Sequence, residues 1–322
     1  MTDYASLVGD TAAFKTIEGD KRSGRLSHAY LVISADGKIK EYLKIFAKLM
    51  ACENPEPCGQ CRVCRLIDSE NCPDVCFYPK NGTSVLTEDV NDIIEKCYLK
   101  PVEGDKKIFI ICRGETMNAS AQNKLLKTLE EPPRGVHIII GSASEFPLLP
   151  TVRSRTEKLE IPPFSSDRLF AALSGECPDA ERLKTAIACG DGTAGKTLEL
   201  YGDENFARIS ELAGRVLAEM KSSRQVLKFS SEIAAEKADL EDFFSALEVR
   251  IRDLLVENEG RPELASERET VAAEGFNTAS LICALEKINE ARKRKKFNGN
   301  GAMLTEWLLF AILEGKHKWQ KS

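Results

Sequence analysis

The sequence of 322 residues has few histidines, no excess of positive charge and no long apolar runs. Without a run of eighteen apolar residues, no membrane span is expected. The N-terminus lacks a basic region followed by an apolar one, so we expect a cytoplasmic protein rather than a secreted one. The three histidines, His28, His137 and His317, show no triad or metal-ligand spacing. A net charge of −5 is unusual for a protein that binds nucleic acid alone, so any DNA contact should be local or shared with partners.

The first half of the chain alternates short apolar runs with segments of helical period. Strands are predicted at residues 29–34, 74–79, 107–111, 136–141 and 157–161, and helices at residues 40–52, 87–99 and 118–133. We expect Thr87 and Asn118 to cap the last two helices and Pro132 to end the final one. This order predicts an open parallel sheet with helices on both faces, a fold that binds nucleotides at the carboxyl ends of its strands.

The second half of the chain is predicted to be helical. Residues 165–205 are typical of a small helical unit, and four apolar stripes of helical period follow at residues 204–220, 241–258, 278–296 and 302–315. The polar stretch 258–277 is expected to hold a loop. The fold class is therefore α/β plus all-α. We predict three domains, at residues 1–164, 165–205 and 206–322.

The sequence has eleven cysteines, an odd number. Disulfides are not expected in a reducing compartment, so a tight group of cysteines indicates metal binding. Four of them form the pattern C-x5-C-x2-C-x2-C: Cys52, Cys58, Cys61 and Cys64. Four close thiolates suit a closed, structural Zn²⁺ site, and Gly59 allows the tight turn. An iron–sulfur cluster and ordinary free thiols are the alternatives. Cys72 and Cys76 lie nearby, so the choice of ligands stays open.

The segment VISADGKIKEY stands where a phosphate loop would connect a strand to a helix. A working loop reads G-x-x-x-x-G-K-[ST], with backbone amides around the phosphates and a hydroxyl on Mg²⁺. Here Gly37 and Lys38 remain, but Val32 replaces the first glycine and Ile39 replaces the hydroxyl. Asp36 adds a negative charge beside the phosphate position. We therefore expect a poor anion cradle.

A second defect lies at the end of the strand predicted at 107–111. Phosphoryl transfer needs a carboxylate that holds Mg²⁺ and a group that positions the nucleophile. The strand runs instead into Cys112 and Arg113, and Glu115 lies three residues beyond the usual metal position. We expect neither tight binding of Mg-ATP nor its hydrolysis. The alternative is an active ATPase with Gly37 and Lys38 in an unusual loop.

Four segments, HAYLV, AKLMACENPEPCGQCRVC, NKLLKTLEEPP and LLPTVRSRT, together resemble the bacterial clamp-loader ATPases of DNA polymerase III. These are AAA+ proteins that open the sliding clamp and place it on primed DNA. The match spans about residues 8–200, and FNGNGAMLTEWLLFAIL is similar to the last helix of the family's collar domain. The two defects are similar to the non-hydrolysing delta-prime branch rather than the gamma/tau motor branch.

The resemblance implies gamma/tau and delta subunits as partners, with the sliding clamp and primed DNA contacted through the hetero-oligomer. It also implies that Arg155 of RSRT is an arginine finger for the ATP site of a neighbouring subunit, with Arg153 as a weaker candidate. Thr156 departs from the cysteine that family members carry there. Lys196 lies near the family's second sensor and is expected to be a solvated helix residue. The basic run 292–296 either touches DNA phosphates or is the charged end of a helix, the reading we favour.

Overall fold

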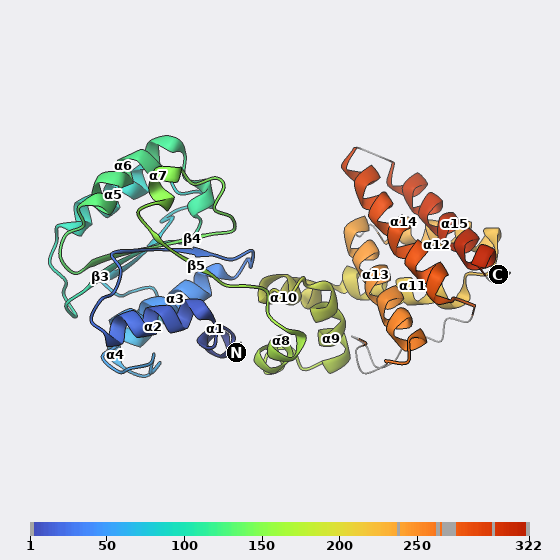
Figure 1. Cartoon of the computed structure of the whole chain (residues 1–322), viewed down its shortest axis with the longest axis horizontal. Coiled ribbons are helices and arrows are strands. Elements are labelled where there is room, and N and C mark those ends of the chain that lie inside the picture. The colour runs from blue at the N-terminus through green and yellow to red at the C-terminus, as the bar shows by residue number, and fades with distance from the viewer. Residues whose placement is uncertain (1–2, 237–238, 262–264, 266–274, 298–299, 320–322) are drawn as a thin grey trace. The chain divides into compact units, whose positions relative to one another are not determined.

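The structure is a computed structural model that describes residues 3–236, 239–261, 265, 275–297 and 300–319 (Figure 1). It divides into two compact units, residues 1–173 and 174–322. Most of the expected lid, residues 174–205, and the whole expected collar fall in the second unit. The finer division into three domains remains a prediction.

A five-stranded parallel sheet forms the centre of the first unit. Its strands are β1 (Ala29–Ile33), β2 (Val75–Tyr78), β3 (Lys107–Ile111), β4 (Val136–Ser142) and β5 (Glu157–Glu160). They lie in the order β2-β3-β4-β1-β5, and every neighbouring pair is parallel. The predicted fold class is confirmed, and each predicted strand agrees with the observed one to within a residue at either end. Parallel strands of this kind are buried on both faces, as β3 and β4 are throughout.

Helices cover both faces of this sheet. One face carries α1 (Tyr4–Gly9), α2 (Ala12–Arg22), α3 (Ile39–Ala51) and α4 (Arg62–Asp68), and the other carries α5 (Thr87–Cys97), α6 (Ala119–Glu130) and α7 (Pro150–Arg153) (Figure 1). Helix α8 (Ser166–Leu173) packs against α1. The sequence analysis predicted α3, α5 and α6 but assigned no helix to α1, α2 or α4.

The two predicted helix caps differ in outcome. Asn118 caps α6 as expected, because its Oδ1 accepts the N–H of Ala121 at 2.8 Å. The prediction that Thr87 caps α5 is wrong by one residue, since Leu86 is the N-cap. The Asp89 carboxylate accepts the Leu86 N–H at 2.9 Å, which gives this backbone donor at the start of the helix a hydrogen-bond partner.

The second unit is helical in all its described elements. These are α9 (Ala180–Cys189), α10 (Ala194–Gly202), α11 (Glu204–Glu219), α12 (Ser223–Ala235), α13 (Leu240–Asn258), α14 (Thr278–Lys296) and α15 (Gly301–Trp319). The last five share one core that includes Phe229, Phe243 and Phe244. Helix α12 was not among the four predicted helices. The loop predicted at 258–277 lies largely outside the described residues.

A smaller core joins the start of the second unit to its main bundle. Ala186, Cys189, Leu200, Phe206 and Val249 bring α9 and α10 against α11 and α13. Burial of each of the larger side chains, Leu200, Phe206 and Val249, stabilises the fold by about 1.5–3 kcal/mol. No helix in the described ranges is long and apolar enough to cross a membrane.

Candidate functional site

Four cysteine side chains converge between the end of α3 and the start of α4. The Sγ atom of Cys52 lies 3.7 Å from that of Cys58 and 3.9 Å from that of Cys61, and the Sγ atoms of Cys58 and Cys64 are 4.0 Å apart. All four sulfur atoms lie within 4.8 Å of one another. Four Zn–S bonds of about 2.3 Å in a tetrahedron place the sulfur atoms about 3.8 Å apart. The geometry therefore fits a metal ion such as Zn²⁺.

Backbone donors around this cysteine cluster favour the thiolate form. The N–H of Cys61 donates to Cys58 Sγ at 3.3 Å, and the N–H of Cys64 donates to Cys61 Sγ at 3.4 Å. The N–H groups of Cys61 and Gln60 lower the pKa of Cys58 to about 6. Gly59 supplies the left-handed turn of the knuckle, with φ +66°. Burial raises the pKa of Cys64 instead, so the four ligands differ in how readily they lose a proton when a metal binds.

The converging group holds only the four predicted cysteines. Cys72 and Cys76 are not among its members. In the described part of the chain, no other set of three or more His, Cys, Asp or Glu side chains brings its ligand atoms together in this way.

The loop between β1 and α3 is filled by its own carboxylate. Asp36 is buried; its Oδ1 accepts the N–H of Lys38 at 2.8 Å, and its Oδ2 accepts the hydroxyl of Tyr42 at 2.5 Å. Burial, followed by the charge of Asp36, raises the pKa of Tyr42, so this hydroxyl stays a donor. Lys38 is the N-cap of α3. A backbone donor that a phosphate loop offers to its ligand is thus engaged by Asp36.

Beside this loop a cavity of about 840 Å³ lies at the carboxyl ends of the strands. Its charged side chains are largely paired: Lys40 Nζ lies 2.7 Å from a carboxylate oxygen of Glu70, and Arg113 Nε lies 3.8 Å from Glu115. Burial raises the pKa of Cys112 to about 12, so a neutral thiol ends β3. Mg²⁺ prefers oxygen ligands, so this thiol is a poor replacement for a carboxylate.

Of the residues singled out in the sequence, Glu115 and Gly37 line this cavity and Lys38 does not. The Glu115 carboxylate accepts the N–H of Ala143 at 3.3 Å, which ties the end of β3 to the end of β4. The side chain of Lys38 is exposed, whereas Gly37 lines the cavity.

Arg155 lies at the surface between α7 and β5, held by contacts within its own unit. One terminal nitrogen of its guanidinium lies 2.7 Å from a carboxylate oxygen of Glu130, the last residue of α6. The other donates to the carbonyl oxygen of Thr151 at 3.0 Å and to Ser154 Oγ at 3.3 Å. The side chain is still 34% exposed. The guanidinium is thus oriented, charged and accessible.

Arg153 has a longer ion pair than Arg155, and its side chain is exposed to the same extent, 34%. Its guanidinium lies 3.7 Å from Glu145, a carboxylate that also pairs with Lys158 at 3.1 Å. Its Nε atom is buried, and no hydrogen-bond partner for it occurs among the described residues.

Gln122, which the sequence analysis did not single out, fixes the segment that carries Arg155. Its side chain is buried, and its Nε2 donates to the carbonyl oxygens of Met117 at 2.9 Å and Pro147 at 3.1 Å. Its Oε1 accepts the N–H of Leu149, the N-cap of α7, at 2.7 Å. Helix α6 therefore sets where α7 begins. The sequence could have indicated this role of Gln122 only by placing a polar residue on the apolar face of a predicted helix.

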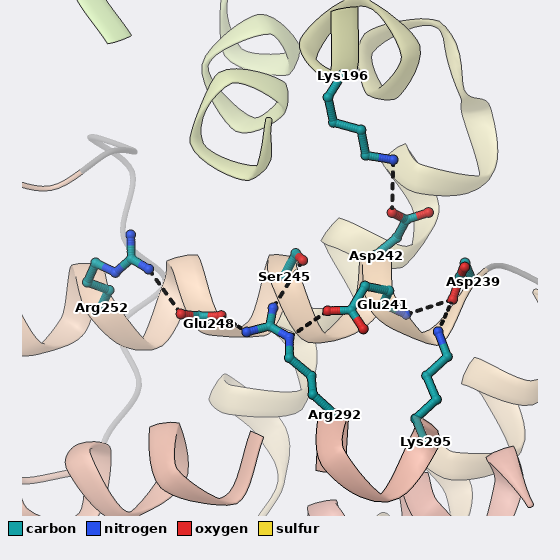
Figure 2. Close-up of polar contacts among 9 residues, drawn as sticks. All are labelled: Lys196, Asp239, Glu241, Asp242, Ser245, Glu248, Arg252, Arg292 and Lys295. Atoms are coloured by element: carbon teal, nitrogen blue, oxygen red, sulfur yellow. Dashed lines mark hydrogen bonds and ion pairs between the residues drawn. The ribbon is translucent and has the colours of Figure 1, made fainter. Parts of the chain in front are cut away.

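Lys196 on α10 is partly exposed but not simply solvated. Its Nζ lies 3.7 Å from the Asp242 carboxylate on α13 (Figure 2). It also lies 3.6 Å from a carboxylate oxygen of Glu199. Burial raises the pKa of Asp242, and the charge of Lys196 opposes that rise. The pair links α10 to α13 within the second unit.

In the basic run at the end of α14, Arg292 is bound to α13. Its guanidinium lies 2.5 Å from Glu241, is ion-paired with Glu248, and donates to Ser245 Oγ at 3.2 Å (Figure 2). These three acceptors stand at spacings of four and three residues, which places them on one face of α13.

Two further cations of the run 292–296 are engaged as well. Lys295 Nζ lies 2.5 Å from Asp239 (Figure 2), and the Arg294 guanidinium lies 3.9 Å from the ring centre of Trp307. These contacts favour the charged end of a helix over a dedicated DNA surface.

The first unit is similar in sequence to known proteins. Residues 9–165 match the family model described as "DNA polymerase III, delta subunit". This segment is therefore similar to subunits of the DNA polymerase III clamp loader. It is 31% identical over 199 residues to DNA polymerase III subunit delta' of Bacillus subtilis, an alignment that covers 60% of this chain and 58% of that protein.

Further clamp-loader subunits give similar matches. DNA polymerase III subunit delta' of Yersinia pestis is 33% identical over 45% of this chain and 44% of its own length. Subunit tau of Bacillus subtilis is 29% identical over 56% of this chain and 32% of its own length. The chain thus spans about half the length of the delta' relatives that it matches. A solved structure of a gamma subunit-related protein from Thermotoga maritima covers 93% of this chain and 99% of its own, at 20% identity and a TM-score of 0.42.

Proposed function

We propose that this protein is a non-hydrolysing, delta-prime-like clamp-loader subunit that lends Arg155 to the ATP site of a neighbouring subunit. The observation that carries the proposal is the Asp36 carboxylate at the start of α3. It accepts the Lys38 N–H and the Tyr42 hydroxyl, and its charge opposes a phosphate at the same place.

Two further features support the absence of hydrolysis in this subunit. Ile39 has no hydroxyl to offer Mg²⁺, and β3 ends in a buried neutral thiol, Cys112, rather than in a carboxylate. Loss of the phosphate cradle and loss of the metal ligand are independent changes in two different loops. Both act against Mg-ATP.

The contribution to a neighbour rests on Arg155. A guanidinium is always charged and presents planar donors that match phosphate oxygens. In other phosphoryl-transfer systems a finger of this kind accelerates the reaction by about 10³–10⁵. Glu130, Thr151 and Ser154 hold the group in one orientation while leaving it accessible.

The assembly we propose contains gamma/tau and delta subunits and contacts the sliding clamp and primed DNA as a whole. In this scheme residues 1–164 are a degenerate AAA+ domain, residues 165–205 a lid and residues 206–322 an oligomerisation collar. The cysteine cluster holds a structural Zn²⁺. Metal analysis tests this last point: about one zinc per chain is expected, whereas iron without zinc would favour an iron–sulfur cluster.

A second candidate is an active ATPase of the gamma/tau type. It is favoured by Gly37 and Lys38 and by relatives named gamma and tau. Calorimetric titration of the purified chain with Mg-ATP, together with a phosphate-release assay, separates the two. We expect no saturable binding of Mg-ATP up to about 1 mM and no turnover. A dissociation constant of about 1 mM corresponds to a binding free energy of about −4 kcal/mol. Micromolar affinity with turnover would establish the second candidate instead.

A further inference from the structure

Lys21, in the last turn of α2, reaches into the loop that separates the first metal-ligating cysteine from the other three. Its Nζ donates to the carbonyl oxygen of Cys52 at 2.7 Å and to that of Pro55 at 3.4 Å, and it also bonds the carbonyl oxygen of Asn54. An ammonium has three N–H donors. Here three carbonyl groups of one short loop receive them.

The position of this ammonium bears on one ligand in particular. Cys58, Cys61 and Cys64 are held near one another by the knuckle and by the first turn of α4. Cys52 is the C-cap of α3 and is joined to them through five intervening residues. The Cys52 N–H donates to the carbonyl oxygen of Lys48 at 2.8 Å, and Asn54 Nδ2 donates to the Cys52 sulfur at 3.7 Å, so these contacts come from α3 and from the loop itself. Lys21 adds a contact from a different helix and ties the loop to α2.

Charge acts in the same direction as the hydrogen bonds. A Zn²⁺ ion with four thiolates carries two net negative charges, and a cation bonded to the backbone of a ligand residue offsets part of them. A cation is also favoured at the C-terminal end of α3, where the last carbonyl groups carry partial negative charge.

We propose that Lys21 is a positioning residue of the metal site, which holds the carbonyl groups of residues 52–55 and thereby keeps the Cys52 sulfur within reach of the other three. This inference rests on the proposed zinc site. If Lys21 only joined α2 to α3, its loss would lower stability equally with and without metal and would leave metal release unchanged.

The test compares Lys21→Met with Lys15→Met. Both variants replace one lysine of α2, but Lys15 is exposed, and only Lys21 is hydrogen-bonded to the carbonyl groups of residues 52–55 in the described part of the chain. The zinc-loaded proteins are mixed with a chelating dye, and the rate and extent of release are recorded. Because partners of metal ligands typically contribute 10- to 100-fold in metal affinity, we expect zinc to bind at least about 10-fold more weakly in Lys21→Met. Lys15→Met should match the wild type.

Cobalt-loaded samples add a spectroscopic readout. The absorption bands of a tetrahedral four-thiolate cobalt site should appear in the wild type and in Lys15→Met, and should be weakened or displaced in Lys21→Met. If Lys21→Met fails to fold, Lys21→Gln, which is uncharged and shorter, takes its place with the same expected loss. Wild-type protein that binds no zinc or cobalt would overturn the metal site itself. Bound zinc with equal release from the Lys21 variant and the wild type would overturn only the role of Lys21.

Discussion

At the level of single residues, our proposals about phosphate depend on two carboxylates, Asp36 and Glu130. Asp36 fills the start of α3 with a negative charge, and Glu130 holds a positive charge at the surface through Arg155. The sequence predicted the first effect, because Asp36 lies next to Gly37 and Lys38 in the altered loop. It gave no indication of the second, since residues 130 and 155 come together only through the packing of α6 and α7.

Replacing Glu130 tests whether Arg155 is oriented from within its own chain. We expect Glu130→Gln to lower the ATPase rate of the reconstituted assembly several-fold, and less than Arg155→Ala does, because Thr151 and Ser154 still bind the guanidinium. The double variant should be no slower than Arg155→Ala alone, since both changes act through one group. Steady-state phosphate release measures all three. Independent, multiplying losses would show that Glu130 does not act through Arg155.

At the level of elements, apolar patterns predicted the positions of the strands but not their order in the sheet or the short helices. The runs at 107–111 and 136–141 are buried in full, so their limits were readable from hydrophobicity alone. The strand order was not readable, because it depends on which strands pair across long crossovers. Short helices such as α4 depend on the cysteine knuckle rather than on an apolar stripe, and Gln122 makes its bonds to residues 5 to 27 positions away.

Gln122 offers a test of how α6 sets the start of α7. Gln122→Leu leaves the Leu149 N–H and two carbonyl groups without their side-chain partner, so we expect the free energy of unfolding to fall by about 1–3 kcal/mol. Urea denaturation measures the change. Asn123→Leu, on the exposed face of the same helix, should change stability by no more than about 0.5 kcal/mol. Equal effects of the two changes would contradict the structural role of Gln122.

The basic run at the end of α14 allows a similar test in the second unit. Arg292→Met removes the contacts with Glu241, Ser245 and Glu248, and we expect a loss of about 1–2 kcal/mol, moderated by partial exposure to solvent. Lys293→Met, an exposed neighbour, should have little effect on stability. Thermal and urea unfolding measure both variants. If only Lys293→Met mattered, and only for DNA binding, the run would be a DNA surface instead.

At the level of the whole molecule, we propose that the parallel sheet supports other groups rather than nucleotide chemistry of its own. In our account the sheet serves as a rigid support for Arg155, because β5 begins two residues after it and pairs with β1. The similarity to clamp-loader subunits lies in residues 9–165. The residues that contact each neighbouring subunit depend on the partner chains, and no sequence pattern in this chain specifies them.

The measurement that tests this account most directly is the ATPase and clamp-loading rate of the assembly reconstituted with Arg155→Ala. We expect the variant to assemble normally and to lose turnover at the neighbouring site by about 10³-fold, while Arg134→Ala, an exposed arginine of the same unit, keeps the wild-type rate. Assembly is checked by size-exclusion chromatography. A fully assembled complex in which Arg155→Ala hydrolyses ATP and loads clamps at the wild-type rate would contradict the central claim.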